Sequence, residues 1–210
     1  QRHLVTVRDL RSITRVPPPL TISVDAARRF LRSTTHLDTP APDLATVLTH
    51  LGYVQIDPIN VCGRMHDLIL RNRVAGYREG DLMLHLHGSP AAPLPAAGRT
   101  AFEHHHPVRS NLAAFPLDAW PHLLAAMHAR TRRAGAWSGR LTPRERELAQ
   151  PILDEIRARG PLSSEAFNDD RKARRVWGAA TLAKATMQKL FFHGRLLIAA
   201  RVGPRRLYDL

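Results

Sequence analysis

Apolar residues at helical spacing predict two helices near the start of the chain. The first follows Ser23, and its apolar stripe consists of Ala26, Ala27, Phe30 and Leu31. The second runs from Asp43 to Gly52. Ser and Asp are favourable caps because their side-chain oxygens accept the first backbone N–H groups, and Gly adopts the left-handed conformation that ends many helices.

The stretch after the second helix alternates between polar and apolar residues. If residues 53–57 are extended, Val54 and Ile56 point to one side while Gln55 and Asp57 point to the other. Pro58 then begins a predicted third helix over residues 59–71. Its inward positions are Val61, Met65, Leu68 and Ile69, and its more polar positions are Arg64, His66 and Asp67. A short fourth helix is predicted over residues 80–86.

Proline and glycine mark residues 89–98 as a linker, and a further helix is predicted over residues 117–132. The pattern after residue 142 is helix, short strand, brief helix, a third helix from Thr181 to Gly194, and a hairpin over residues 196–209. This is the element order of a winged helix, which binds either DNA or another protein.

The predicted fold class is therefore mainly α with short β hairpins, arranged as tandem winged-helix domains. We divide the chain into a basic tail (1–20), a first winged-helix-like domain (21–88), a linker with a connecting helix (89–141) and a second winged-helix domain (142–210).

The charge of the chain favours a polyanionic partner. Lys and Arg number 31 against 18 Asp and Glu, a formal net charge of +13. A membrane surface is the competing partner, but the arginines are spread along the chain instead of gathering on one amphipathic helix. No apolar run approaches the roughly 18 to 20 residues of a membrane span, and there is a single cysteine. We expect a cytoplasmic protein that associates with nucleic acid.

Gln55 and Asp57 are the candidate catalytic pair. A carboxylate and an amide on one small surface could hold a water molecule beside a developing positive charge. Alternatively, both residues lie on the solvent face of a half-buried strand, and Asp57 forms an Asx turn. A metal site at His104, His105 and His106 is disfavoured because adjacent residues point in different directions, and no cofactor is predicted.

Three blocks of sequence resemble the bacterial AlkZ-like winged-helix DNA glycosylases. Leu51-Gly52-Tyr53-Val54-Gln55-Ile56-Asp57, followed by Arg64-Met65-His66, resembles the catalytic motif of that family. Phe102-Glu103 resembles the start of its central segment. The third block, which resembles its second winged helix, comprises residues 159–163, 190–194 and 206–210.

The resemblance implies excision of N7-alkylated purines or unhooking of interstrand crosslinks, with Asp57 and Gln55 as the catalytic residues and double-stranded DNA as the partner of a monomer. Together with the charge pattern it suggests DNA contacts at Arg64, His66, Arg73, Lys184, Gln188, Arg201, Arg205 and Arg206.

The chain also departs from the family pattern. Arg71 stands where the family commonly has Trp, and His104-His105 and Pro107-Val108 replace an aromatic-Trp and a His-Glu pair. The family continues into a third domain after the second winged helix. One alternative is a non-catalytic winged-helix protein with a DNA-binding or regulatory role. The other is a protein-interaction module.

Overall fold

The computed structural model describes residues 19–57, 59–89, 91–108, 111–167 and 181–210. The predicted basic tail lies almost entirely outside these ranges, as do Pro58 and Ala180. The α-helices are α1 (Val24–Thr34), α2 (Leu44–Leu51), α3 (Met65–Leu70), α4 (Asp81–His87), α5 (Trp120–Arg130), α6 (Pro143–Arg159) and α7 (Leu182–Phe192). The strands are β1 (Val54–Gln55), β2 (Gly88–Ser89), β3 (Ala92–Pro93), β4 (Ala101–His105), β5 (Leu112–Pro116), β6 (Leu197–Val202) and β7 (Arg205–Asp209). Short 3₁₀ turns are η2 (Ala96–Gly98), η3 (Leu117–Ala119) and η4 (Ser164–Ala166).

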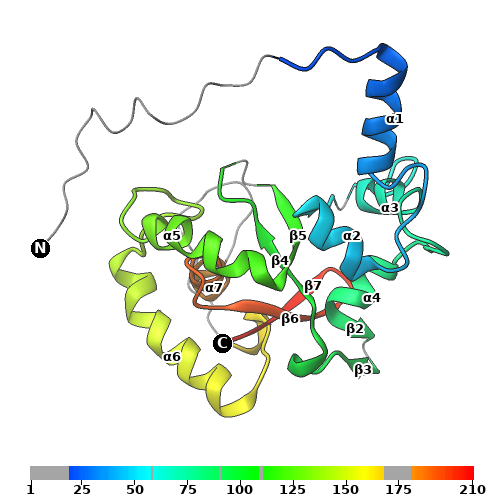
Figure 1. Ribbon diagram of the computed structural model, residues 1–210. Coiled ribbons are helices and arrows are strands. Elements are labelled where there is room, and N and C mark those ends of the chain that lie inside the picture. Colours follow the sequence, from blue (N-terminus) through cyan, green and yellow to red (C-terminus); the bar gives the residue numbers. More distant parts are fainter. Residues whose placement is uncertain (1–18, 58, 90, 109–110, 168–180) are drawn as a thin grey trace, which may run out of the picture.

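Helices joined by small antiparallel sheets make up the described part of the chain (Figure 1), which confirms a helix-rich fold with short hairpins. The largest sheet has the order β1-β5-β4, with Val54 opposite Ala114 and Phe102 opposite Phe115. No helix in the described ranges is long and apolar enough to cross a membrane.

The caps predicted at Ser23 and Asp43 are confirmed, and two further helices have side-chain caps. Side-chain oxygens of Ser23, Asp43 and Thr181 each accept a hydrogen bond from a backbone N–H in the first turn of α1, α2 and α7. Thr142 and Glu145 form a reciprocal capping box at the start of α6. Gly52 ends α2 with a φ of 77°, a conformation that favours glycine.

Helix α1 stands away from the rest of the molecule (Figure 1), and none of its residues is buried. Phe30 and Leu31, which belong to the predicted apolar stripe, are 62% and 60% exposed. The stripe therefore exists but is not buried, so its spacing predicted the helix and not its burial.

The prediction for the third helix is wrong in extent and orientation. Helix α3 has six residues, and residues 59–64 form a loop. Val61, predicted to face inward, is 90% exposed, whereas His66 and Asp67 are buried. The cause is the turn at Asp57, whose Oδ1 accepts the backbone N–H of Ile59 at 2.9 Å. This Asx turn delays the start of the helix and changes the face that it buries.

Two hairpins were not predicted. Strands β4 and β5 pair over five residues each and bring the histidine cluster into the sheet. The segment predicted as a linker contains η2 and the small β2–β3 hairpin. Its small residues and prolines carried no alternation from which a strand could be predicted.

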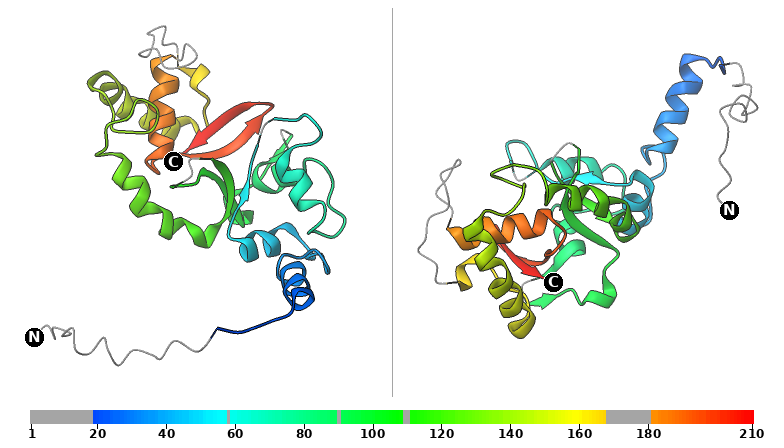
Figure 2. Two further views of the ribbon diagram at one scale, coloured as in Figure 1. Left: turned by 90° about the horizontal axis from the view of Figure 1, so that it is seen from above. Right: turned by 90° about the vertical axis from the view of Figure 1, so that its left-hand side faces the viewer.

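The second half of the chain follows the predicted order of elements. Helices α6 and α7 pack against each other, and Leu162 pairs with Tyr208 in an isolated bridge. The β6–β7 hairpin lies between α7 and the helices of the first half (Figure 2), where β6 packs against α4 and β4. One wall of the space between the two halves is therefore built by this hairpin.

Candidate functional site

Residues 53–57, which include β1 and are called the motif strand below, carry Gln55 and Asp57 on the face opposite the buried apolar residues. Val54 and Ile56 are 2% and 6% exposed, whereas Gln55 and Asp57 are half-buried. Gln55 pairs with Ala113, and the N–H of Ile56 donates to the Leu112 carbonyl, which extends the pairing by one residue. The alternation predicted from sequence is present, together with the Asx turn that was its structural alternative.

A large cleft opens between the two halves of the chain, with a volume of about 1150 Å³. The first half contributes residues from the motif strand, the start of α3, α4 and β5. The second half contributes the η4 turn, α7 and the tip of the β6–β7 hairpin. Ile56 lines the cleft, but Gln55 and Asp57 on either side of it do not.

Seven of the eight residues suggested as DNA contacts line this one cleft: Arg64, His66, Lys184, Gln188, Arg201, Arg205 and Arg206. They come from residues 64–66 and 184–206, which are far apart in the sequence. Arg73 is the exception, because it is absent from the lining and its guanidinium donates to the Ile69 carbonyl at 2.9 Å.

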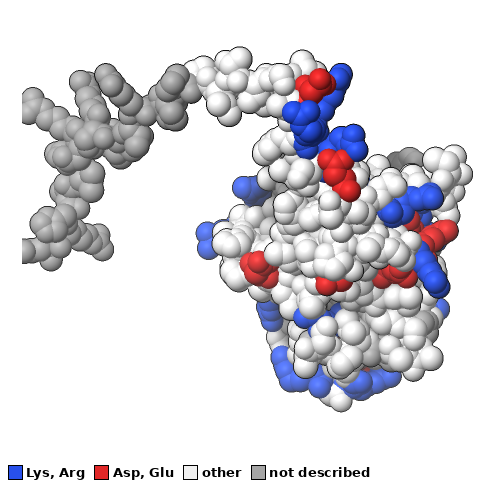
Figure 3. All heavy atoms as spheres, turned by 45° about the vertical axis from the view of Figure 1, so that its right-hand side comes forward, with Lys and Arg blue, Asp and Glu red and all other residues white. Residues whose placement is uncertain are grey.

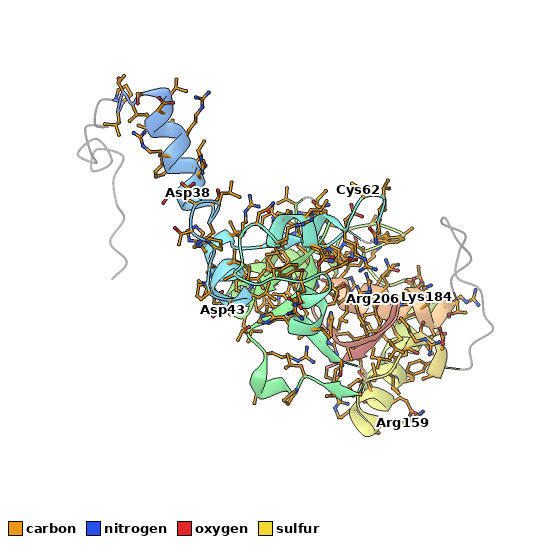
Figure 4. The ribbon with its side chains drawn as sticks, turned by 90° about the vertical axis from the view of Figure 1, so that its right-hand side faces the viewer. Asp38, Asp43, Cys62, Arg159, Lys184 and Arg206 are labelled. Atoms are coloured by element: carbon orange, nitrogen blue, oxygen red, sulfur yellow. The ribbon has the colours of Figure 1, made fainter. Side chains whose placement is uncertain are left out.

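The cations of the cleft differ in how strongly they are already paired. Arg205 makes an exposed ion pair with Glu165 at 2.9 Å, and Arg64 lies 3.8 Å from Glu79. Lys184 has no ion pair among the described residues. Lys184 and Arg206, both labelled in Figure 4, line the cleft. These side chains can exchange weak surface pairs for phosphate oxygens.

Lys and Arg also occur far from the cleft. Figure 3 shows them on the projecting helix α1 and along the lower edge of the molecule, with acidic groups in between. Charge alone therefore does not identify a binding surface. The cleft is singled out because its cations surround a concave surface that the motif strand also reaches.

Glu103 is a buried acid that sequence reasoning did not assign to the site. It is 1% exposed and accepts hydrogen bonds from both the Nε and a terminal nitrogen of Arg201, and it lies 3.0 Å from Nε2 of His87. Arg206 lies 3.9 Å away. Burial alone would raise the pKa of Glu103, but these hydrogen bonds and the two guanidinium charges outweigh it and lower the pKa to about 2.

The three adjacent histidines at the end of β4, His104, His105 and His106, make structural contacts. His104 is buried, and its Nε2 donates to the Phe191 carbonyl at 2.8 Å, which ties β4 to α7. His105 packs against Phe192 with the two rings tilted, and His106 lies against Tyr53. Within the described ranges, no group of His, Cys, Asp and Glu side chains is arranged to hold a metal ion.

His66 is the buried residue of the cleft wall nearest in sequence to the motif strand. Burial lowers its pKa, whereas the charges of neighbouring acids, Asp57 among them, act in the opposite direction. The carboxylate of Asp57 therefore acts electrostatically on a side chain that lines the cleft, although Asp57 does not line it.

A protein-family model described as "DNA glycosylase AlkZ-like" matches residues 48–210. The match covers most of the chain and includes the motif strand and every residue that lines the cleft. No solved structure was found to match the chain.

Proposed function

The chain belongs to the AlkZ-like family of DNA glycosylases, and we propose that it hydrolyses the N-glycosidic bond of N7-alkylated purines in duplex DNA. Interstrand crosslinks that join two strands through such a base are proposed as substrates too. The family membership supports DNA as the substrate, and the choice of lesion extends the resemblance described above.

The cleft carries the proposal. Among the described residues, its lining has five cationic side chains and one acid: Arg64, Lys184, Arg201, Arg205, Arg206 and Glu165. Such a surface suits the phosphate backbone, because each neutralised phosphate releases condensed counterions. We assign the two flanking units to tandem winged helices, in which α7 is the candidate groove-reading helix and the β6–β7 tip contacts phosphates.

The chemistry of the lesion explains why few catalytic groups are needed. An N7-alkylated purine is cationic and already a good leaving group, so the remaining task is to stabilise the sugar oxocarbenium ion and supply water. A carboxylate about 4 Å from that cation contributes roughly 4 kcal/mol at an effective dielectric of about 20. We assign this stabilisation to Asp57 and the orientation of the water to Gln55.

The test measures base release from a duplex containing N7-methylguanine and unhooking of a nitrogen-mustard crosslink. We expect the wild type to release the base and Asp57→Asn to be slower by at least about tenfold, the cost of roughly 1.4 kcal/mol of barrier. Asp154→Asn is the matched control, because Asp154 is an exposed acid on α6. Release that is absent from the wild type, or equal in wild type and Asp57→Asn, contradicts the proposal.

A non-catalytic DNA-binding protein is the second candidate, and one observation favours it. Asp57 is engaged in the Asx turn with Ile59 and is absent from the cleft lining. A protein of this kind binds undamaged and alkylated duplexes equally in a salt-sensitive manner and releases no base. The same two substrates therefore separate the candidates.

A further inference from the structure

His66 is a buried imidazole on the cleft wall without a hydrogen-bond partner. It is 1% exposed, it lines the cleft, and neither ring nitrogen has a partner among the described residues. Buried polar atoms are nearly always hydrogen-bonded, because an unmade bond costs about 1 to 3 kcal/mol. An imidazole in this state beside an open cleft indicates a position where a ligand or its attacking water completes the hydrogen bonding.

Asp67 lies beside this ring. Nε2 of His66 lies 3.6 Å from Oδ2 of Asp67, which also lacks a hydrogen-bond partner in the described part of the chain. The other oxygen of Asp67 is fixed by the Tyr77 hydroxyl at 2.6 Å and the Gly80 N–H at 3.1 Å. A carboxylate beside Nε2 favours a hydrogen on that nitrogen, which leaves the Nδ1 lone pair available. Contacts of this length commonly shorten when a substrate binds.

The surrounding charges suit a ring that begins neutral and then accepts a proton. Burial lowers the pKa of His66, and the charge of Arg64 adds to this effect. The carboxylates of Asp67, Asp57 and Glu103 act in the opposite direction. The imidazole is therefore neutral near pH 7, and three acids stabilise the imidazolium once it forms.

We propose that His66, oriented by Asp67, is the general base that takes a proton from the attacking water, an inference that rests on the proposed function. The bond between sugar C1′ and purine N9 breaks, and its electron pair leaves with the base and neutralises the alkylated ring. The water oxygen bonds to C1′, and the released proton passes to Nδ1 of His66. Between cleavage of the C1′–N9 bond and attack of the water, Asp57 stabilises the sugar cation while Oδ1 keeps its hydrogen bond from Ile59.

The test compares single-turnover release of N7-methylguanine by the wild type and His66→Gln. Glutamine retains polarity but cannot accept the proton, so we expect a rate about 100-fold lower at pH 7.5 and duplex affinity within about threefold. The wild-type rate, corrected for release without enzyme, falls with decreasing pH at a point below the ordinary histidine pKa of about 6.5, because burial lowers the pKa of His66, and His66→Gln lacks this part of the profile. Both proteins keep the charged groups that face the ring, namely Asp67, Arg64, Asp57 and Glu103.

His193 provides the matched control. It is also buried, but its Nε2 donates to the Gly139 carbonyl and it does not line the cleft. His193→Gln lowers stability and leaves the rate of the folded protein unchanged. ¹⁵N NMR of the wild type supplies a readout independent of activity, in which His66 carries its hydrogen on Nε2.

Each outcome decides the proposal. If the wild type is active and the His66→Gln variant releases the base at a rate within about threefold of it, the general-base role alone is overturned. If His66→Gln fails to fold, an NMR spectrum that places the hydrogen of wild-type His66 on Nδ1 overturns that role. A wild type that releases no alkylated base contradicts the proposed function, and the inference falls with it.

Discussion

Arg201 on β6 donates its Nε hydrogen to Oε2 of Glu103 on β4 at 2.8 Å, across 98 positions in the sequence. A second hydrogen bond joins another guanidinium nitrogen to Oε1, so the contact is bidentate. Glu103 also accepts from His87 at the end of α4. One buried acid therefore fixes the hairpin of the second half against two elements of the first, and Arg201 is held by the protein before any DNA binds.

Replacing this acid should destabilise the fold. Glu103→Gln leaves the Arg201 guanidinium without its carboxylate in a largely buried place, and we expect a loss of about 3 to 5 kcal/mol in the free energy of unfolding. Urea denaturation at pH 7.5 measures it. Glu155→Gln is the control, because Glu155 pairs with Arg159 on the exposed surface of α6, where such a pair contributes about 0.5 kcal/mol. Equal losses in the two variants would refute this role of Glu103.

Acid should lower stability in two steps. Burial lowers the pKa values of His66, His104 and His193, so the unfolded chain binds more protons and stability is lost as the pH falls below about 6.5. Glu103 has a folded pKa of about 2 against 4.5 when unfolded. Its contribution, about 3 kcal/mol, is complete above pH 4.5 and is lost as the pH falls from there toward 2.

Urea denaturation at pH 7.5, 5.5 and 3.5 measures both steps, with Glu103→Gln alongside the wild type. The variant keeps the upper step and loses the lower one. A wild type whose stability does not change between pH 7.5 and 5.5 would show that the buried histidines are not linked to folding.

Local signals in the sequence predicted much of the fold. The caps at Ser23 and Asp43, the helix after Thr181 and the hairpin after Gly194 lie where spacing and turn residues placed them. The start of α3 was missed because apolar spacing at Val61 was read as helical, and the Asx turn at Asp57 overrides that spacing. The β4–β5 hairpin was missed because its five-residue strands carry little alternation.

The sequence predicted the basic residues of the candidate site but not the role of the buried acid Glu103. Basic residues and a family-like motif pointed to Arg64, Lys184 and the hairpin arginines, which the fold brings into one cleft. Glu103 was quoted only as part of a resemblance. A single acid on a strand gives no sign of the partners it meets 98 residues away, because its burial and its ion pair are tertiary properties.

The corrected start of α3 can be tested by stability. Val61 is 90% exposed and Leu70 is fully buried. Val61→Ala should change the free energy of unfolding by less than about 0.5 kcal/mol, whereas Leu70→Ala should cost about 2 to 5 kcal/mol. Thermal or urea denaturation distinguishes them. A loss above about 1 kcal/mol in the free energy of unfolding of Val61→Ala would instead support the longer helix predicted from spacing.

The cleft should bind duplex DNA with a salt dependence that individual cations set. Lys184 lines the cleft without a protein ion pair in the described ranges, so we expect Lys184→Ala to reduce the slope of log K against log salt by about 1. Arg201→Ala should lower affinity mainly by releasing the hairpin from Glu103, because its guanidinium is already neutralised.

Arg159 is a basic control on α6 outside the cleft (Figure 4), and Arg159→Ala should leave the slope unchanged. Fluorescence anisotropy with an undamaged duplex between about 0.05 and 0.2 M salt gives all three slopes. Equal reductions for Lys184 and Arg159 would mean that DNA binds by overall charge, and the cleft would lose its place as the DNA-binding surface.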